Sequence, residues 1–173
     1  RRVLFRSKNL PLELIEKYND ILNWDALSSN NNLTIELCEK HIDNINWYYL
    51  CKNINIPITF FEKHIDKINW VALCENINIP IEFFEKYIAD VNWVALCKNT
   101  NIPITFFEKH INKIDWWEFS AYQDISIDFF NKYIDKINYD GLSRNDKFIK
   151  NIGCQNNYKS HSLITLSLLK YQT

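Results

Sequence analysis

Glycine and proline are scarce in this chain of 173 residues, which contains two glycines and four prolines. A β-sandwich built on many tight turns uses more of both residue types, so the composition argues against that class of fold. No apolar run approaches the roughly 20 residues that a membrane-spanning helix needs. The formal net charge is only −1, which gives the chain no general attraction for nucleic acid or for anionic membranes.

The sequence motifs of common catalytic sites are also missing. There is no Gly-x-Ser-x-Gly, no glycine-rich phosphate loop and no His-Glu-x-x-His. Carboxylates are plentiful, but they recur at regular intervals, which is typical of a solvated surface. We therefore predict that the chain is not an enzyme, and we expect neither a cofactor nor a metal site.

A large aromatic residue recurs every 23 residues and organises the whole chain. A constant interval of this length is the mark of a tandem repeat. We predict that these residues are the structural anchors of the array, and they are Trp24, Trp47, Trp70, Trp93, Trp116 and Tyr139.

The period divides the chain into six repeats and two irregular ends. The repeats are predicted at 11–33, 34–56, 57–79, 80–102, 103–125 and 126–148, within an array that spans 1–148. Residues 1–10 read as half of a degenerate repeat, which either caps the array or continues a longer one. Residues 149–173 leave the register, and their apolar residues from Leu163 to Tyr171 predict a helix that closes the open end of the array.

Each repeat is expected to begin with a helix of about twelve residues. Pro57 marks its start, because proline suits the beginning of a helix and because Thr or Ser replaces it in other repeats. Phe61, Ile65 and Ile68 then recur at i, i+4 and i+7, which predicts a buried stripe on a helix over 57–68. A helix this short is marginal alone and must pack on its neighbours.

A second, shorter helix is expected to follow, at about 70–75 in the third repeat. Asn69 precedes it at a position where Asn or Asp always stands, as an N-cap requires. Asn76 closes it, and we expect a left-handed C′ residue there. Tyr122 replaces this asparagine and predicts an altered turn in the fifth repeat. Two helices per repeat without a strand pattern give the predicted fold class, which is all-α: an α-solenoid of six two-helix repeats.

Three positions of the repeat could carry chemistry. One alternates histidine and tyrosine (Tyr18, His41, His64, Tyr87, His110 and Tyr133). A metal needs its ligands about 2 Å away, whereas packed helices are ~8–10 Å apart, so we favour half-buried aromatic rings whose polar tips reach water. The second holds Cys51, Cys74 and Cys97, with serine in other repeats, which favours a small buried residue. The odd count of five cysteines and the lack of a signal peptide suggest a reducing, intracellular environment.

The third position is lysine in all six repeats (Lys17, Lys40, Lys63, Lys86, Lys109 and Lys132). A lysine ladder could follow a phosphate backbone. However, Glu or Asp stands four residues before several of these lysines, in the order that favours ion pairs within a helix. We therefore favour a self-neutralised, solvated helix face.

The most variable positions follow the anchors and suggest a surface for a partner. The position after the anchor varies from Asp25 to Val71 to Trp117, so we expect it to be exposed. Aromatic residues there are of the kind enriched at protein interfaces. With Val71, Ala72, Val94 and Ala95 they would form two aromatic clusters joined by a smooth apolar strip. The predicted partner-binding residues are Tyr48, Tyr49, Val71, Val94, Trp117 and Tyr122.

Two functions are consistent with this pattern. The first is a non-enzymatic protein-interaction or structural scaffold module, whose partner could include another copy of the chain. The alternative is a protein that binds single-stranded nucleic acid, with Tyr48, Tyr49 and Trp117 stacking on bases. The acidic residues beside the lysines make nucleic acid the less favoured partner, and we expect no membrane partner.

The repeat also resembles a known type of protein. Units that read Ile-Asn-Trp-x-x-Leu-Ser/Cys-x-Asn, followed by Phe-Phe-Glu-Lys-His-Ile-Asp-Lys-Ile, are similar to short helical repeats in proteins encoded by giant DNA viruses of the mimivirus type. The resemblance covers about residues 10–148. It implies a viral interaction or structural protein inside the cell, in the cytoplasm or in the virion or virus factory. It carries no catalytic or binding residue over to this chain.

Overall fold

The fold is an all-α repeat solenoid. The computed structural model describes residues 17–18 and 21–151, and these consist of helices, turns and connecting loops, with no strand among them. The chain divides into two compact units, residues 1–91 and 92–173, which we call unit 1 and unit 2. Each unit is described by itself.

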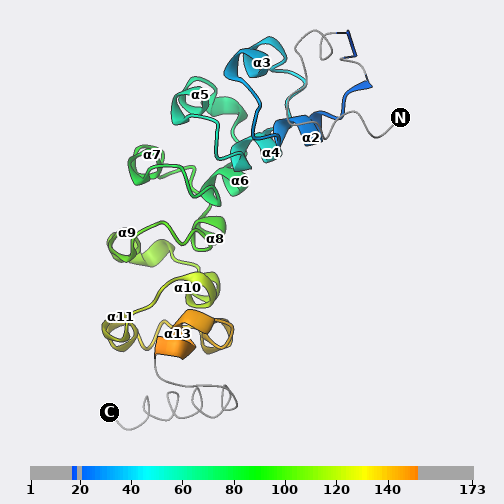
Figure 1. The fold of residues 1–173 in the computed structure, drawn as a ribbon. Helices are drawn as coiled ribbons and strands as arrows, with labels where there is room; N and C mark the ends of the chain where they lie inside the picture. Colours follow the sequence, from blue (N-terminus) through cyan, green and yellow to red (C-terminus); the bar gives the residue numbers. More distant parts are fainter. Residues whose placement is uncertain (1–16, 19–20, 152–173) are drawn as a thin grey trace. The chain divides into compact units, whose positions relative to one another are not determined.

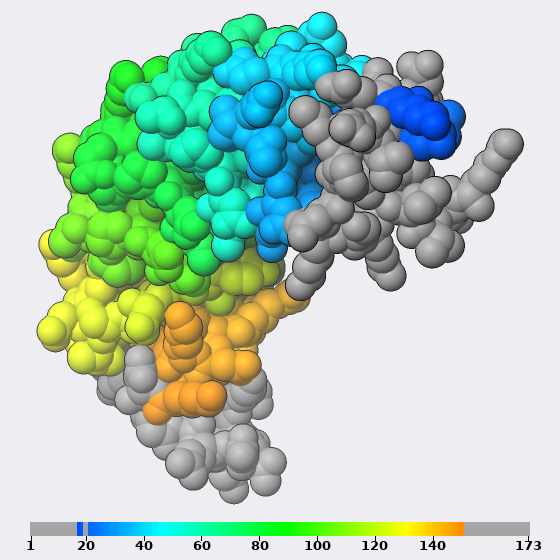
Figure 2. All heavy atoms as spheres, turned by 45° about the horizontal axis from the view of Figure 1, so that its top comes forward, coloured from blue at the N-terminus to red at the C-terminus, as the bar shows by residue number. Residues whose placement is uncertain are grey.

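Unit 1 contains two rows of short helices that alternate along the chain (Figure 1). One row consists of α2 (Trp24–Ser28), α4 (Trp47–Lys52) and α6 (Trp70–Cys74), which we call the anchor helices. The other consists of α3 (Ile35–Lys40), α5 (Ile58–Lys63) and α7 (Ile81–Lys86). Within the first row α2 packs on α4 and α4 packs on α6, so consecutive repeats lie side by side in chain order (Figure 2).

Unit 2 repeats this arrangement. Its anchor helices are α8 (Trp93–Leu96), α10 (Trp116–Tyr122) and α12 (Tyr139–Leu142), and α10 packs extensively on α12. The other row contains α9 (Ile104–Lys109) and α11 (Ile127–Lys132). A last helix, α13 (Asp146–Asn151), crosses the end of the sixth predicted repeat at residue 148. The predicted half-repeat 1–10 and the helix predicted after residue 162 lie outside the described residues.

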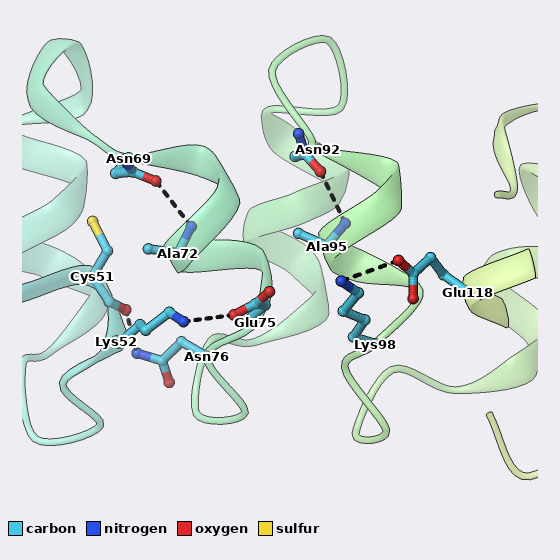
Figure 3. Close-up of polar contacts among 10 residues, drawn as sticks. All are labelled: Cys51, Lys52, Asn69, Ala72, Glu75, Asn76, Asn92, Ala95, Lys98 and Glu118. Atoms are coloured by element: carbon cyan, nitrogen blue, oxygen red, sulfur yellow. Dashed lines mark hydrogen bonds and ion pairs between the residues drawn. The ribbon is translucent and has the colours of Figure 1, made fainter. Parts of the chain in front are cut away.

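The predicted helix starts are confirmed. In the third repeat the Asn69 side chain accepts a hydrogen bond of 3.0 Å from the backbone N–H of Ala72 (Figure 3). The side chains of Asn23, Asn46, Asn92, Asp115 and Asn138 cap the other anchor helices in the same way. The N-caps of the second row are Thr34, Pro57, Pro80, Pro103 and Ser126. Asn, Asp, Ser and Thr supply an acceptor for an otherwise unpaired N–H at the helix start, which explains why they recur there.

The prediction of a twelve-residue first helix is wrong. Helix α5 ends at Lys63, and a separate 3-10 turn follows at Ile65–Lys67. His64 separates the two with a non-helical backbone, at φ −123° and ψ 43°, and its ring packs 4.8 Å from that of Phe60. The break turns the chain toward the next anchor helix. Ile65 and Ile68 are half-buried here and do not continue a helical stripe from Phe61, although the equivalents of Ile68 in other repeats, such as Ile45 and Val91, are buried.

Phenylalanine and leucine make up the core, while the tryptophans lie at its edge. The fully buried side chains include Phe61, Phe84, Phe107, Phe130, Leu50, Leu73, Leu96 and Leu142. Trp70 is half-buried and packs against the next helix, with its ring centre 5.9 Å from that of Phe83 and 6.0 Å from that of Tyr87. The anchors therefore join adjacent repeats rather than filling the centre of the core.

Gly141 allows α12 to approach α10 closely. A Cβ atom at this residue would lie 2.4 Å from the backbone oxygen of Trp117, where no real contact can exist. Alanine holds the equivalent position in other repeats, at Ala72 and Ala95. The close approach of α12 to α10 therefore requires a residue without a side chain at position 141.

We expect Gly141→Ala to lower the free energy of unfolding by about 1–3 kcal/mol, since the new methyl group must push two backbones apart. Urea unfolding followed by circular dichroism would measure the change. Ala95→Gly is the comparison, because it removes the buried methyl group of the equivalent residue and adds no atom, so its loss of helix propensity, about 1 kcal/mol, comes without a clash. A Gly141→Ala variant more stable than the parent would contradict the close approach.

Candidate interaction surface

Buried asparagines connect successive repeats and leave the other side chains free to vary. The Nδ2 of Asn76 donates to the backbone oxygens of Cys51, at 2.8 Å, and Asn53, at 3.4 Å (Figure 3). Its Oδ1 accepts from the backbone N–H of Asn78 at 3.0 Å. Asn53, Gln123 and Asn145 donate to two backbone oxygens of the preceding repeat in the same way. We call this set the amide ladder.

The structure at the amide ladder contradicts one prediction about the ends of the anchor helices and confirms another. Asn53 is the equivalent of Asn76 in the second repeat, where the same left-handed C′ role is expected, but its backbone is extended, at φ −75° and ψ 111°, so that prediction is wrong at Asn53. The predicted change in the fifth repeat is confirmed, because α10 extends to Tyr122 and is longer than the equivalent α6. Gln123 then takes the ladder position one residue later. Its longer side chain reaches the oxygens of Cys97, at 2.7 Å, and Asn99, at 3.0 Å.

The cysteine and serine positions are buried and accept a hydrogen bond. The Oγ of Ser28 accepts from the backbone N–H of Asn46, the N-cap of the next anchor helix, at 3.0 Å. The same contact joins Ser120 to Asn138, Cys51 to Asn69 and Cys97 to Asp115. Burial raises the pKa of the Cys51 thiol to about 12, although the Asn69 N–H acts in the opposite direction. A protonated, enclosed thiol is a packing group rather than a nucleophile.

We expect Cys51→Ser to lower the free energy of unfolding by less than about 1 kcal/mol, because the hydroxyl keeps the acceptor. Cys51→Ala should lower it by about 1–3 kcal/mol, because the Asn69 N–H loses its partner. Urea unfolding of the two variants, side by side, would compare them. Equal stability of the serine and alanine variants would show that the acceptor is unimportant.

The histidine and tyrosine rings are half-buried, as predicted, except that of Tyr18, which is exposed. The prediction that their polar tips reach water is wrong for His41 and His110, whose Nε2 atoms are buried. The His64 ring packs on those of Phe60, at 4.8 Å, and Trp47, at 5.9 Å. Its Nε2 lies 3.2 Å from a carboxylate oxygen of Glu39. In unit 2 the ring of Tyr133 makes the equivalent contacts with Phe129, Trp116 and Glu108. Both residue types fit because each combines a flat ring with a polar tip.

Three of the lysines pair with glutamates of the preceding repeat rather than with an acid of their own helix. Lys63 lies 2.7 Å from Glu39, and the same ion pair joins Lys86 to Glu62 and Lys132 to Glu108. The i, i+4 pairing predicted for Lys86 and Lys132 is therefore wrong, although their charge is still neutralised. Two residues 24 positions apart, on adjacent stacked repeats, are therefore closer together than two residues four positions apart on one helix.

These ion pairs shift the pKa values of exposed carboxyls. The hydrogen bond from Lys63 holds the pKa of Glu39 below its ordinary value of 4.5. A depressed carboxyl pKa stabilises the fold above pH 4.5, and this contribution disappears as the pH falls through the folded-state value. The groups are exposed, so salt should screen the effect.

Unit 1 exposes a group of large apolar side chains beside its anchor helices. They are Tyr48, Tyr49, Ile54, Val71 and Ile77, which we call the unit 1 face. Tyr48 packs edge-on against Tyr49, with ring centres 5.3 Å apart, and Lys52 lies 4.7 Å from the centre of the Tyr48 ring. Sequence reasoning missed Ile54 and Ile77. Their position holds Asn31 and Thr100 in other repeats, and this variation could have indicated an exposed site.

Two residues of the unit 1 face, Ile54 and Ile77, line a shallow cleft of about 210 Å³ together with Lys52, Glu75 and Asn76. Lys52 forms an ion pair of 2.8 Å with Glu75 across the two repeats (Figure 3). That hydrogen bond raises the pKa of Lys52, and the Tyr48 side chain adds to the effect. The cleft therefore combines two exposed isoleucines with one neutralised pair of charges.

The predicted apolar strip needs correction. Val71 and Val94 are exposed, at 44% and 45%, but Ala72 and Ala95 are buried and cannot contribute. In unit 2, Tyr122 is exposed, while Trp117 is half-buried beneath the Arg144 guanidinium, 5.2 Å from the ring centre. We call Val94, Trp117 and Tyr122 the unit 2 face. The proposed role of these residues in binding stays a prediction.

The described part of the chain also bears on metal sites and membrane spans. No three of its His, Cys, Asp or Glu side chains gather closely enough to hold a metal ion. None of the helices described has both the length and the apolar character needed to cross a membrane. Compared with protein-family models, curated proteins and solved structures, the chain matches none.

Proposed function

We propose that the chain is a non-enzymatic interaction module that binds a protein through the side of its anchor helices. The observation that carries the proposal is the unit 1 face, where five large apolar side chains are exposed together. Exposed apolar patches mark binding surfaces more often than isolated apolar residues do. Two adjacent tyrosines add the aromatic groups that contribute most to protein interfaces.

The rest of the repeat supports a scaffold role. Cysteines, histidines and lysines, which carry chemistry in enzymes, here accept a buried backbone hydrogen bond, stack on rings or pair with the preceding repeat, as Cys51, His64 and Lys63 do. The pairing of Lys63, Lys86 and Lys132 with glutamates also disfavours the alternative of nucleic-acid binding, because these lysines already have anionic partners. A viral, intracellular setting fits this role and is part of the proposal, on the resemblance of the repeats alone.

Affinity capture from cells of the organism that encodes the chain would test the proposal. We expect the parent to retain a protein that a Tyr48→Ala/Tyr49→Ala variant loses, because both side chains are exposed and their removal should not unfold the array. Thr59→Ala is the matched control, since Thr59 is exposed on α5 in the other row. Circular dichroism should show equal helix content in all three chains.

Three results would contradict the proposal. The variant could retain every protein that the parent retains, or the control could lose the same protein. Capture of nucleic acid alone, weakened by salt, would favour the alternative function instead. Trp117 is not used in this test, because its packing under Arg144 would mix a change in stability with a change in binding.

A further inference from the structure

The charges that line the cleft beside Ile54 and Ile77 are arranged so that they could pair with those of an identical face. Lys52 and Glu75 occupy the same position in adjacent repeats, 23 residues apart, and carry opposite charges. Ile54 and Ile77 are likewise equivalent to one another, and both line the cleft. The second repeat thus contributes a basic residue and an isoleucine to the face, and the third repeat contributes an acidic residue and the equivalent isoleucine.

Two copies of this face that are related by a two-fold axis can present opposite charges to each other. Symmetric dimers use the same patch on both chains, so a contact from one residue to another is made twice. If two unit 1 faces meet in antiparallel order, the second repeat of one chain lies opposite the third repeat of the other. Lys52 of each chain then faces Glu75 of the other, and Ile54 faces Ile77. The parallel order would instead place like charges opposite each other.

We propose that the unit 1 face binds the unit 1 face of a second copy of this chain in antiparallel order. The inference rests on the proposed function and names the partner for it. A strongly charged partner fits less well, because the face has no net charge to attract it. The apolar area is small, and interfaces below about 1,200 Å² of total buried surface are typical of weak, transient complexes. The dimer should therefore dissociate on dilution.

Sedimentation velocity across a concentration series would test the pairing. We expect the parent to shift from monomer to dimer as its concentration rises through the micromolar range. Lys52→Glu and Glu75→Lys should each raise the dissociation constant at least tenfold, because four like charges then meet at the centre of the interface. An equimolar mixture of the two variants should recover dimers, since one chain is now acidic where the other is basic.

The controls separate folding from association. Both charges are partly exposed, so circular dichroism should show the parent helix content in each variant. Ile54→Ser/Ile77→Ser should abolish the dimer without restoring it in any mixture. Lys63→Glu reverses a charge in the other row and should leave the dissociation constant unchanged.

The outcomes distinguish this inference from the function on which it rests. A parent that stays monomeric throughout, single variants that dimerise like the parent, or a mixture that fails to recover dimers would each overturn the antiparallel pairing. A monomeric parent that still captures a different protein through Tyr48 and Tyr49 would overturn the pairing alone. A monomeric parent that captures nothing would overturn both.

Discussion

Replacement of Phe84 by alanine should lower the free energy of unfolding by about 3–5 kcal/mol, the usual loss when a fully buried aromatic ring is removed. Phe84 has no exposed surface, and its equivalents Phe61 and Phe107 are buried to the same degree. In a solenoid each repeat contacts only its neighbours, so other repeats offer no distant contacts to compensate for the loss. Urea unfolding followed by circular dichroism would measure it.

Trp70→Ala provides the comparison, because it removes a larger ring from a half-buried site. We expect a smaller loss of about 2 kcal/mol, since part of the indole already contacts water. The test depends on which of the two variants loses more free energy of unfolding, and less on the size of either loss. If Trp70→Ala proves as destabilising as Phe84→Ala, the tryptophans belong to the core and their position at its edge is wrong.

Asn76→Ala is expected to lower the free energy of unfolding by about 3 kcal/mol, although it removes only a small side chain. The amide donates to the oxygens of Cys51 and Asn53 and accepts from the N–H of Asn78. All three bonds lie in a site where Asn76 itself is almost fully buried. An unpaired buried polar group costs about 1–3 kcal/mol, and backbone groups that lose a partner here cannot easily reach water.

Asn78→Ala is the matched control, since Asn78 also donates to the preceding repeat, at 2.9 Å from the oxygen of Ile54, but in an exposed position. Water can replace this bond, so we expect a loss of at most about 1 kcal/mol. Equal losses in the two variants would show that burial of the amide ladder contributes nothing. Thermal unfolding at several protein concentrations would exclude a contribution from self-association.

Much of the fold could be predicted from local patterns. Asn69 and its equivalents were assigned as N-caps because a capping bond spans only three residues, as its contact with Ala72 does. The interchange of proline with Thr34 and Ser126 marked the start of the other helices for the same reason. Helix length was harder to predict. The break at His64 depends on rings of Phe60 and Trp47, and Trp47 belongs to the preceding repeat.

The candidate site was predicted only in part. Variation at the position after each anchor indicated the exposed Tyr48, Val71 and Val94, since a position that accepts Asp and Val cannot be a uniform core site. The same reasoning was extended wrongly to Ala72 and Ala95, which are buried. The exposure of Ile54 and Ile77 could not be predicted from the Asn-Ile-Asn-Ile segment, because its first isoleucine is exposed while its second, such as Ile56, is buried.

The sequence by itself determined the period, the helix starts and the all-α class, because these depend on interactions within a few residues and on a pattern that repeats. The tertiary structure decided which groups meet across the repeats. The amide of Asn76 reaches carbonyls 23 and 25 residues earlier, and Lys86 pairs with Glu62 rather than with an acid in its own helix. These partners are determined by the distance between stacked repeats, and that distance cannot be inferred from the spacing of residues within one repeat.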